Sequence, residues 1–512
     1  MRRVAVGLSR NLRASAIPCG VAGTSMMSDC AGTFGAGCLK ALSASHPRAA
    51  DFLSSLSAQA TDVPSQLHLA IGAADHELML TWTTKNECPQ SRVWLTREHQ
   101  PAYDVAATTY TYTVPDMWWQ PKTMKWIHSA TLTGLVGREV FEYKVGDNVT
   151  EGCQVLEVPV EAKAPPSRGD LPISMALMAD VGSIELLGFA MWRALDQRSR
   201  LGDSLDTDLA VHAGDVSYAG MDAAIPFLNV SKYDEWEPLW DVYGLAHQNY
   251  TQRRAYQLGI GNHEAWYNWT ATTHRYPTAQ SDVPAVSGAA PPFWYTFVAG
   301  GVHWTMLSTE HDYSPGSVQY TFLDAALAAV DRKVTPWSAV AFHRPMYSSD
   351  KSEYDGHKPG CSIQVHLEPL MLRHKVDLVF TGHQHAYERV HPNIAGNVTS
   401  MPTPLAGLVD PFGANTAYVR PGAPLYLLGG HGGAVQDFSW VEPAPSWSAV
   451  RLSSGCDFSG GRHCIPDPRN LLDTYGYVHA EFFNRTHARL HTEMVTKGQP
   501  HDGFWLIRAD GA

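Results

Sequence analysis

Five apolar runs of this 512-residue chain end in side chains of the kinds that bind metal ions through oxygen or imidazole nitrogen. Each run has the length and composition of a buried strand. Ligands collect where strands end and loops begin, so the simplest arrangement brings all five ends to one crevice. The predicted strands are ISMALM (173–178), DLAVHA (208–213), YQLGI (256–260), WSAVAF (337–342) and VDLVFT (376–381). The residues that follow them are Asp180, Asp215, Tyr218, Asn262, His343, His383 and His385.

Local spacing within these segments carries further information. His383 and His385 are two positions apart, so in extended backbone both rings project to the same side while Gln384 points away. Asp215 and Tyr218 are three apart and would share one face if a helix began after Gly214. A tyrosine phenol titrates near 10 and is ionised at neutral pH only beside a very strong Lewis acid, which favours Fe(III).

The ordered blocks DxG, GDxxY, GNHE, VxxH and GHxH resemble the purple acid phosphatases, which belong to the calcineurin-like metallophosphoesterase superfamily. All five blocks occur in this order between Asp180 and His385. The similarity extends through STEHD, HRPMY and GHQHAYERV, and it is closer to the large two-domain form than to the short mammalian type. The match therefore covers the whole expected site.

The resemblance implies a role for each ligand. Asp180, Tyr218 and His385 would hold Fe(III), and Asp215 would bridge to a second ion. Asn262, His343 and His383 would hold that second ion, a divalent Fe, Zn or Mn. Two carboxylates and a phenolate contribute about −3 against about +5 from the ions, so a phosphate ester is attracted to the remaining positive charge.

The expected reaction is attack of a metal-bound hydroxide on the ester, with an acidic pH optimum. His263, beside Asn262 in GNHE, is the candidate catalytic residue, either binding phosphate or protonating the leaving alkoxide. One feature departs from the family pattern, in which further histidine usually lies a short way after the VxxH block, near the leaving group. Here His343 is followed by RPMYSSDKSEYDGH, so that the next histidine, His357, comes fourteen residues later. Either His357 reaches the leaving-group side, or residues such as Arg344, Tyr347 and Lys358 line it. The candidate substrate-binding residues are thus His263, Asn262, Arg344 and His357.

These observations predict an acid phosphatase that cleaves phosphomonoesters. One alternative is a phosphodiesterase or nucleotide pyrophosphatase using the same metal site. Another is a catalytically silent phosphate-binding protein, which the intact ligand set disfavours.

The predicted fold class is α+β, in two domains. Residues 64–163 alternate polar and apolar positions in short runs such as LMLTWTT and FEYKVG, which is typical of a small β-sandwich and matches the fibronectin-like domain of the large family members. After the linker EAKAPPSRGD, residues 170–512 would form the metallophosphoesterase domain, a central two-sheet sandwich flanked by helices. Residues 1–63 are expected to be poorly structured.

Six of the twelve asparagines begin Asn-x-Ser/Thr sequons, which favours a secreted or lumenal glycoprotein. The first thirty residues contain no continuous apolar core, so no clear signal peptide is recognised. The sequons lie at Asn148, Asn229, Asn249, Asn268, Asn397 and Asn484.

Cys88 and Cys153 both lie in the expected sandwich and Cys456 lies near Cys464, so each pair is a candidate disulfide. Cys361 is either free or paired with a distant cysteine.

The net charge of −12 argues against broad binding to nucleic acid, for which clustered Lys and Arg are expected. No apolar stretch is long enough to predict a membrane span. The expected partner is a small phosphorylated substrate, and a homodimer is a further possibility that the sequence leaves open.

Overall fold

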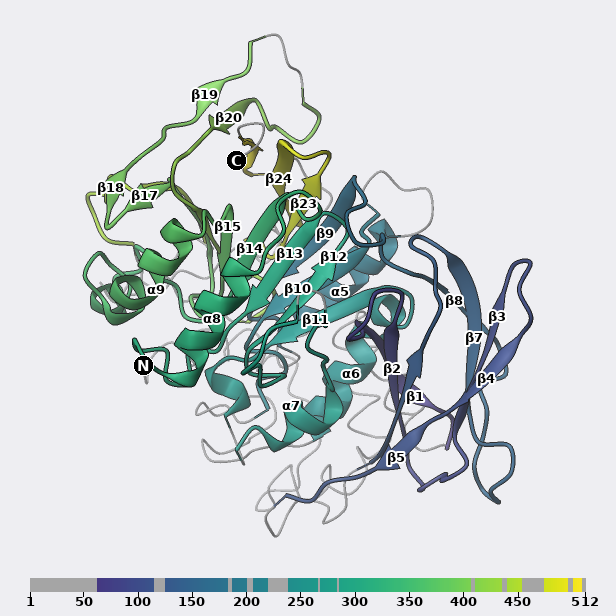
Figure 1. Ribbon diagram of the computed structural model, residues 1–512. Coiled ribbons are helices and arrows are strands. Elements are labelled where there is room, and N and C mark those ends of the chain that lie inside the picture. Colours follow the sequence, from purple (N-terminus) through teal and green to yellow (C-terminus); the bar gives the residue numbers. More distant parts are fainter. Residues whose placement is uncertain are drawn as a thin grey trace, which may run out of the picture.

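The computed structural model describes residues 62–114, 125–182, 187–199, 206–219, 238–265, 268–282, 285–406, 410–434, 440–453, 474–495 and 501–508. These residues form layers of mixed β-sheet with helices on the outer faces, which confirms the α+β class (Figure 1). Nearly all of the segment expected at 1–63 lies outside the described residues, as do Asn229, Cys456 and Cys464.

The amino-terminal part is the expected β-sandwich (Figure 1). Its apolar side chains alternate along the strands and fill the space between two layers, where Trp82, Val93 and Phe141 are at most 1% exposed. A disulfide joins Cys88 to Cys153, as the sequence suggested, while Cys361 is free and buried. One layer contains β1 (Ser65–Ile71), β2 (Leu78–Thr84), β5 (Thr108–Tyr110) and β6 (Trp126–Leu132), and the other contains β3 (Arg92–Arg97), β4 (Tyr103–Ala106), β7 (Val140–Gly146) and β8 (Val160–Lys163).

Two larger sheets pack face to face in the rest of the chain, so their central strands are apolar on both faces. The first sheet has the order β19-β20-β25-β24-β23-β9-β10-β11 and continues into β1 of the sandwich through the pair Leu69 and Ala255. Its strands are β9 (Ile173–Met178), β10 (Leu209–Ala213), β11 (Ala255–Gly259), β19 (Thr403–Pro404), β20 (Thr416–Val419), β23 (Gly476–Phe482), β24 (His487–Met494) and β25 (Gly503–Ile507).

The second sheet has the order β12-β13-β14-β15-β21-β16-β22. Within it, β13, β14, β15 and β21 are parallel neighbours. Its strands are β12 (Tyr295–Ala299), β13 (Val302–Met306), β14 (Trp337–Ala341), β15 (Leu378–Thr381), β16 (Tyr387–Val390), β21 (Leu425–Gly429) and β22 (Ser448–Leu452). A separate short pair contains β17 (Asn393–Ile394) and β18 (Asn397–Val398).

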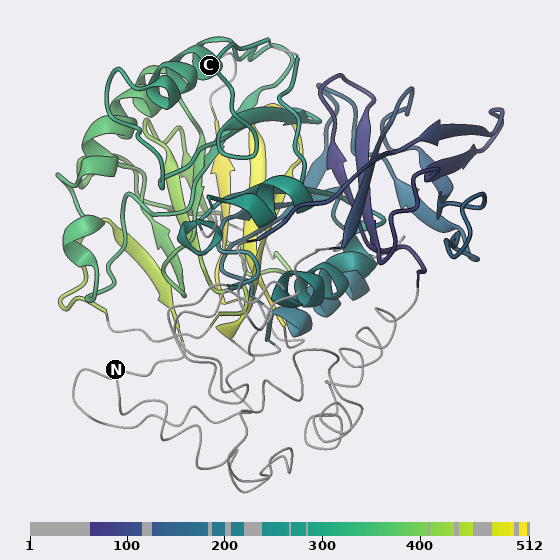
Figure 2. The ribbon, with the colours of Figure 1, turned by 90° about the horizontal axis from the view of Figure 1, so that it is seen from below.

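Helices cover the outer faces of both sheets (Figures 1 and 2). The first sheet packs on α5 (Leu187–Arg198) and α6 (Pro238–Thr251) through a cluster that includes Trp192 and Tyr243. The second packs on α8 (Val318–Ala328) and α9 (Ser362–Arg373). This helix–sheet–sheet–helix layering is the arrangement predicted for the metallophosphoesterase part. The boundary between the two domains, expected at residues 163 and 170, remains a prediction, because the first sheet is joined to strands from both parts of the chain.

Candidate metal centre

The predicted ligands follow the carboxyl ends of adjacent parallel strands. In the first sheet, β9, β10 and β11 lead to Asp180, Asp215 and Asn262, and in the second sheet β14 and β15 lead to His343 and His383. Asn262 begins the one-turn helix η2 (Asn262–Glu264). Because the two sheets face each other, loops that are far apart in sequence converge at one end of the central sandwich.

One group of donors forms around the phenol of Tyr218. Its oxygen lies 2.9 Å from Oδ1 of Asp180 and 2.8 Å from Nε2 of His385. The same histidine nitrogen is 3.6 Å from Oδ1 of Asp180. Asp180 is in turn oriented by the backbone N–H of His383, which donates to its Oδ2 at 2.7 Å. A carboxyl oxygen, a phenol oxygen and an imidazole nitrogen thus point at one position.

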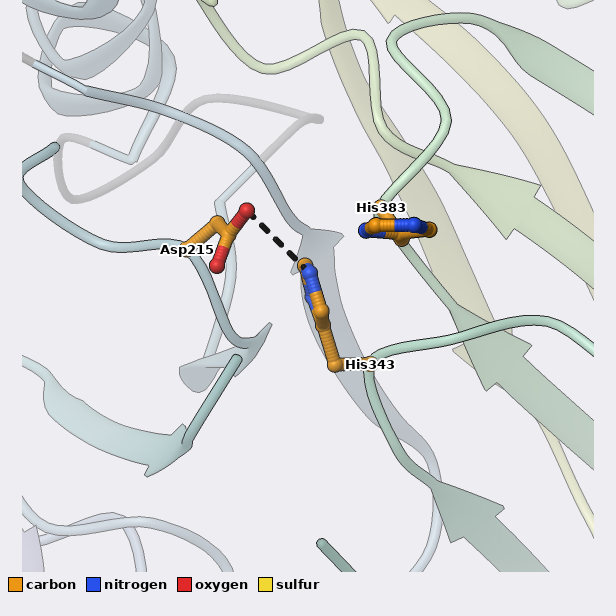
Figure 3. A group of neighbouring side chains, drawn as sticks. All are labelled: Asp215, His343 and His383. Atoms are coloured by element: carbon orange, nitrogen blue, oxygen red, sulfur yellow. Dashed lines mark ion pairs between the residues drawn. The ribbon is translucent and has the colours of Figure 1, made fainter. Parts of the chain in front are cut away.

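A second group of donors forms around His343. Its Nε2 lies 3.2 Å from Oδ2 of Asp215 and 3.1 Å from Oδ1 of Asn262. Nδ1 of the same ring lies 2.9 Å from the Ala213 carbonyl and donates to it, so Nε2 is the nitrogen that would bind an ion once the ion displaces its proton. Figure 3 shows Asp215 facing His343, with His383 on the other side of that ring. One donor atom each from Asp215, His343 and His383 lies within 4.8 Å of the others.

The spacing of these donors fits metal ions. Ligands about 2.0–2.2 Å from an ion and at right angles to one another lie about 3 Å apart, and the contacts above run from 2.8 to 3.6 Å. Four of the seven residues also have positive φ, a conformation that non-glycine residues adopt where a site requires it. They are Asp180 (56°), Asp215 (53°), Tyr218 (57°) and His383 (75°).

The electrostatics show where protons reside in the protein alone. Burial raises the pKa of Tyr218 well above its ordinary value, and the Asp180 and Asp215 carboxylates add to the rise. Burial likewise raises the pKa of Asp180. Although burial opposes both effects, His343 holds the pKa of Asp215 below its usual range and Asp215 raises the pKa of His343 to about 10. Cations that bind here must therefore displace protons.

Glu264, the last residue of GNHE, positions the second group and has no role in the sequence interpretation above. Its buried carboxylate accepts hydrogen bonds at 2.8 Å from the backbone N–H groups of Asp215, Val216 and Gly261. Burial raises its pKa to about 7, with a smaller contribution from Asp215. The only sequence signal for Glu264 is its place in the GNHE block, and its hydrogen bonds to the Asp215 turn are tertiary contacts.

Gly430 is a second positioning residue that the sequence did not reveal. It follows β21 and packs behind Asp180, where an added Cβ would come 2.0 Å from the Gln384 carbonyl and 2.9 Å from Oδ2 of Asp180. Only glycine fits between these atoms. No sequence pattern shows that the segment after β21 lies against the end of β9, since that contact is tertiary.

His263 lies beside both groups. Its backbone N–H donates to Oδ1 of Asp215 at 2.9 Å, and its Nε2 is 3.8 Å from Oδ2 of the same residue. Its ring packs on Tyr218 with the centroids 4.5 Å apart, and its side chain is 21% exposed. His263 therefore reaches both the ion positions and solvent.

The opposite side of the site contains Arg344 and Glu353. Nη1 of Arg344 lies 3.0 Å from Nε2 of His383, and its Nε donates to Oε1 of Glu310 at 2.8 Å. Oε2 of Glu353 lies 2.9 Å from Nε2 of His383 and 3.4 Å from Nε2 of His357. His357 is buried and its Nδ1 bonds to the Pro345 carbonyl, so it supports Glu353 from behind.

The other two residues considered for that side point elsewhere. Tyr347 is buried and donates to Glu368 at 2.6 Å. Lys358 forms an ion pair with Asp355 and lies over the ring of Tyr354.

Two local expectations are wrong. The GHQH segment is not extended, because His383 has a φ of 75°, and its two histidines turn to different donor groups. Residues 214–219 do not form a helix, since Asp215 and Tyr218 both have positive φ and this described segment consists of bends, a turn and irregular backbone. In both places the requirements of the site override the local pattern.

The five sequon asparagines within the described residues are all exposed, although Asn249 lies in α6. They are Asn148, Asn249, Asn268, Asn397 and Asn484. Among the same described residues, no helix is long and apolar enough to cross a membrane.

Comparison with protein families identifies three segments. The family described as "Calcineurin-like phosphoesterase" matches residues 175–387. "Purple acid Phosphatase, N-terminal domain" matches residues 64–156, and "Iron/zinc purple acid phosphatase-like protein C" matches residues 423–502. The fold and the paired donor groups thus define a metallophosphoesterase. The chain belongs to the purple acid phosphatase family, and it is an acid phosphatase whose family implies a binuclear metal centre.

Individual relatives agree with this assignment. Purple acid phosphatase 21 of Arabidopsis thaliana is 31% identical over 340 residues, which cover 64% of this chain and 67% of the relative. A purple acid phosphatase of Glycine max is 28% identical over 447 residues, covering 83% and 81%. The solved structure of purple acid phosphatase PPD1 from yellow lupin (Lupinus luteus) seeds has the same fold, with a TM-score of 0.66 at 20% identity, and covers 88% of this chain and 75% of that chain.

Proposed function

We propose that this acid phosphatase hydrolyses phosphomonoesters at a centre of Fe(III) and a divalent Fe, Zn or Mn. Asp180, Tyr218 and His385 would hold Fe(III), while Asn262, His343 and His383 would hold the divalent ion and Asp215 would bridge. The observation that carries this proposal is the phenol of Tyr218, whose oxygen lies within 2.9 Å of both Asp180 and His385. A phenol with a raised pKa gives up its proton only to a strong Lewis acid, which supports the trivalent ion.

The bound ions supply positive charge that attracts the phosphate ester and acidifies water at the site. The chain's own residues would fix the geometry around them. Glu264 holds the turn that carries Asp215, and the Ala213 carbonyl fixes the ring of His343. Rigid donors of this kind keep the substrate oxygen in line for displacement.

His263 would contact the transferred phosphate or protonate the leaving oxygen through Nε2. Support comes from its partial exposure and from its backbone bond to Asp215, which holds the imidazole beside the donor groups. Asn262, next to it, would contribute its side-chain amide to the bound phosphate as well as its oxygen to the ion.

Arg344 would bind a phosphate oxygen from the opposite side. Glu310 orients the guanidinium, and Nη1 is directed toward His383. We propose that His357 does not contact the substrate itself and instead holds Glu353 at the edge of the site. This arrangement would replace the histidine that relatives place shortly after the VxxH block.

Turnover of p-nitrophenyl phosphate and bis(p-nitrophenyl) phosphate by the metal-loaded protein tests the substrate class. A monoesterase is expected to prefer the monoester by more than tenfold in kcat/KM, with an optimum below pH 7. Preference for the diester would favour the phosphodiesterase alternative, and the absence of turnover with both metals bound would favour a silent phosphate-binding protein. The names of the relatives favour neither alternative.

The exposed sequons support a secreted or lumenal glycoprotein. A mobility shift on deglycosylation would test this. Formation of a homodimer remains a prediction, for which gel filtration with light scattering is the measurement.

A further inference from the structure

A second cluster of potential metal ligands lies on neighbouring strands of the first sheet (Figure 1). His479 and Glu481 are two apart on β23, and His491 lies directly opposite His479 on β24. Side chains two apart on a strand share a face, so all three project from the same face of the sheet. One donor atom from each lies within 4.8 Å of the others. The cluster is separate from the binuclear centre, because His479 pairs with Ala176 within β9, whereas Asp180 follows the end of that strand.

The two imidazoles are buried without the hydrogen bonds that such burial ordinarily requires. Both residues are 1% exposed. Within the described residues, three of the four ring nitrogens have no hydrogen-bond partner. They are Nδ1 and Nε2 of His479 and Nδ1 of His491. The Asp206 main chain comes close enough to raise the pKa of His479 slightly, but it does not satisfy hydrogen-bond geometry. An unsatisfied buried polar group costs about 1–3 kcal/mol, so these nitrogens call for a partner.

The hydrogen bond that His491 makes uses one ring nitrogen and leaves the other available to bind a metal ion. Its Nε2 lies 3.0 Å from Oε1 of Glu493, so Nε2 carries the proton and Nδ1 keeps its lone pair. A carboxylate that accepts from one nitrogen while the other binds metal is the usual support of a histidine ligand. Phe412 stacks on the ring at 4.3 Å and fixes its orientation.

Glu481 is held in place by Arg489. Nε and Nη2 of Arg489 both donate to Oε2 of Glu481, the oxygen that lies 4.0 Å from Nδ1 of His479, while Oε1 accepts from neither of these nitrogens. Arg489 is itself fixed by Asp410 at 2.9 Å and lies over the ring of Phe412. The guanidinium therefore orients the carboxylate and need not occupy the space between the histidines.

The surrounding charge also admits a cation. The nearby carboxylates are Glu481, Glu493 and Asp410, and the nearby guanidinium groups are Arg489 and Arg198. Burial lowers the pKa of both His479 and His491 to about 3, so the rings are neutral and balance none of this charge. Among the described residues, three carboxylates against two guanidinium groups leave a net negative charge when Glu481, whose pKa is raised by burial, is ionised.

We propose that His479, Glu481 and His491 bind a further divalent ion of the zinc class, distinct from the binuclear centre. Two imidazoles and a carboxylate suit a tetrahedral Zn²⁺ that keeps one open position. Ligand atoms of such an ion lie about 3.3 Å apart. The three donor atoms now lie within 4.8 Å of one another, so the side chains must close by up to about 1.5 Å. The ion would join β23 to β24 and give the unpartnered nitrogens a ligand.

Metal analysis of the full-length protein, carrying no histidine tag and purified with its metals, tests the site. His479→Gln and His491→Gln should each contain one metal equivalent per chain less than the unmodified protein. Both variants should keep kcat and the visible absorption band that the proposed Tyr218 phenolate on Fe(III) would give, because the binuclear centre is untouched. If these variants fail to fold, Glu481→Gln, which alters a partly exposed side chain, should show the same loss.

His303→Gln is the matched control. His303 is also fully buried in a strand, and neither of its ring nitrogens has a partner within the described residues, but no further ligand groups with it there. This control should keep the metal content of the unmodified protein. Equal metal content in the unmodified protein and the His479, His491 and Glu481 variants would overturn the proposal, as would an equal loss in the control.

Discussion

The phenol oxygen of Tyr218 lies 2.8 Å from Nε2 of His385, although the two residues are 167 positions apart in the chain. This contact joins the first sheet to the second at the end of the central sandwich. Carboxylates and imidazoles alone would suit two divalent ions. The phenol at this position favours a trivalent ion and is the basis for proposing Fe(III).

Tyr218→Phe should abolish the visible absorption band, because that band requires a phenolate bound to iron. Turnover should fall as well, since the iron loses an anionic ligand. A visible spectrum of the purified variant, together with its iron content, checks this prediction. Tyr250→Phe is the control, because Tyr250 is equally buried but bonds to Thr207 instead, and it should keep the band. A band that survives in Tyr218→Phe would refute the ligand assignment.

Asp215→Asn should remove both ions. The neutral amide cannot offer negative charge to two cations at once, and its NH2 group would face Nε2 of His343. Affinity for both ions should fall by more than about 100-fold, a larger loss than for a supporting residue, and activity should disappear with it. Metal analysis after gel filtration is the measurement. Retention of one ion with normal affinity would show that Asp215 does not bridge.

His263→Ala should keep the colour and both metals but lose most turnover. The side chain contributes no predicted ligand atom, and a positioned acid or phosphate donor accounts for about 10²–10⁴ in rate. The expected fall in kcat is therefore at least about 100-fold. A colourless but active variant would contradict the role proposed for this histidine.

Glu264→Gln should weaken metal binding although Glu264 touches no ion position. The amide NH2 would face backbone N–H groups that the carboxylate now accepts, including that of Asp215. We expect metal affinity to fall about 10- to 100-fold, as for other supporting residues. Glu388→Gln is the control, because Glu388 is also a fully buried acceptor, bonded to Ser349 and Ser448. The Glu388→Gln variant should lower thermal stability without changing metal affinity. Equal metal affinities in the two variants would argue against a role for Glu264 in positioning Asp215.

Stability should fall with acidity because of buried histidines outside the metal centre. Burial lowers the pKa of His128 to about 4 from 6.5, and its ring lies between Thr84 and Thr109. As pH falls below about 6.5 the unfolded chain binds a proton that the folded ring does not bind until about pH 4. The folded state therefore loses stability across this window, by up to about 3 kcal/mol for this residue.

Thermal unfolding between pH 7 and pH 4.5 measures the effect. His128→Gln should flatten the dependence, and it should leave kcat unchanged because the residue lies in the amino-terminal sandwich on β6. Identical pH slopes for the variant and the unmodified protein would show that His128 does not titrate in this way.

The sequence by itself determined the strands and pointed to the candidate ligands. Runs such as ISMALM and LMLTWTT are apolar or alternating over strand lengths, and each forms the strand expected of it. Local composition suffices there because burial of such a run on one or both faces of a sheet is favourable in almost any fold. The same holds for the pairing of Cys88 with Cys153, since both fall within one sandwich.

Only the tertiary structure decided the backbone direction at the predicted ligands and which residues support them. Four ligand positions have positive φ, so local pattern could not give the backbone direction at Asp215 or His383. The contacts of Glu353 with His383, and of Gly430 with Asp180, join segments 30 and 250 residues apart. Such contacts depend on how two sheets and their loops pack, and packing is a property of the whole chain rather than of any short segment.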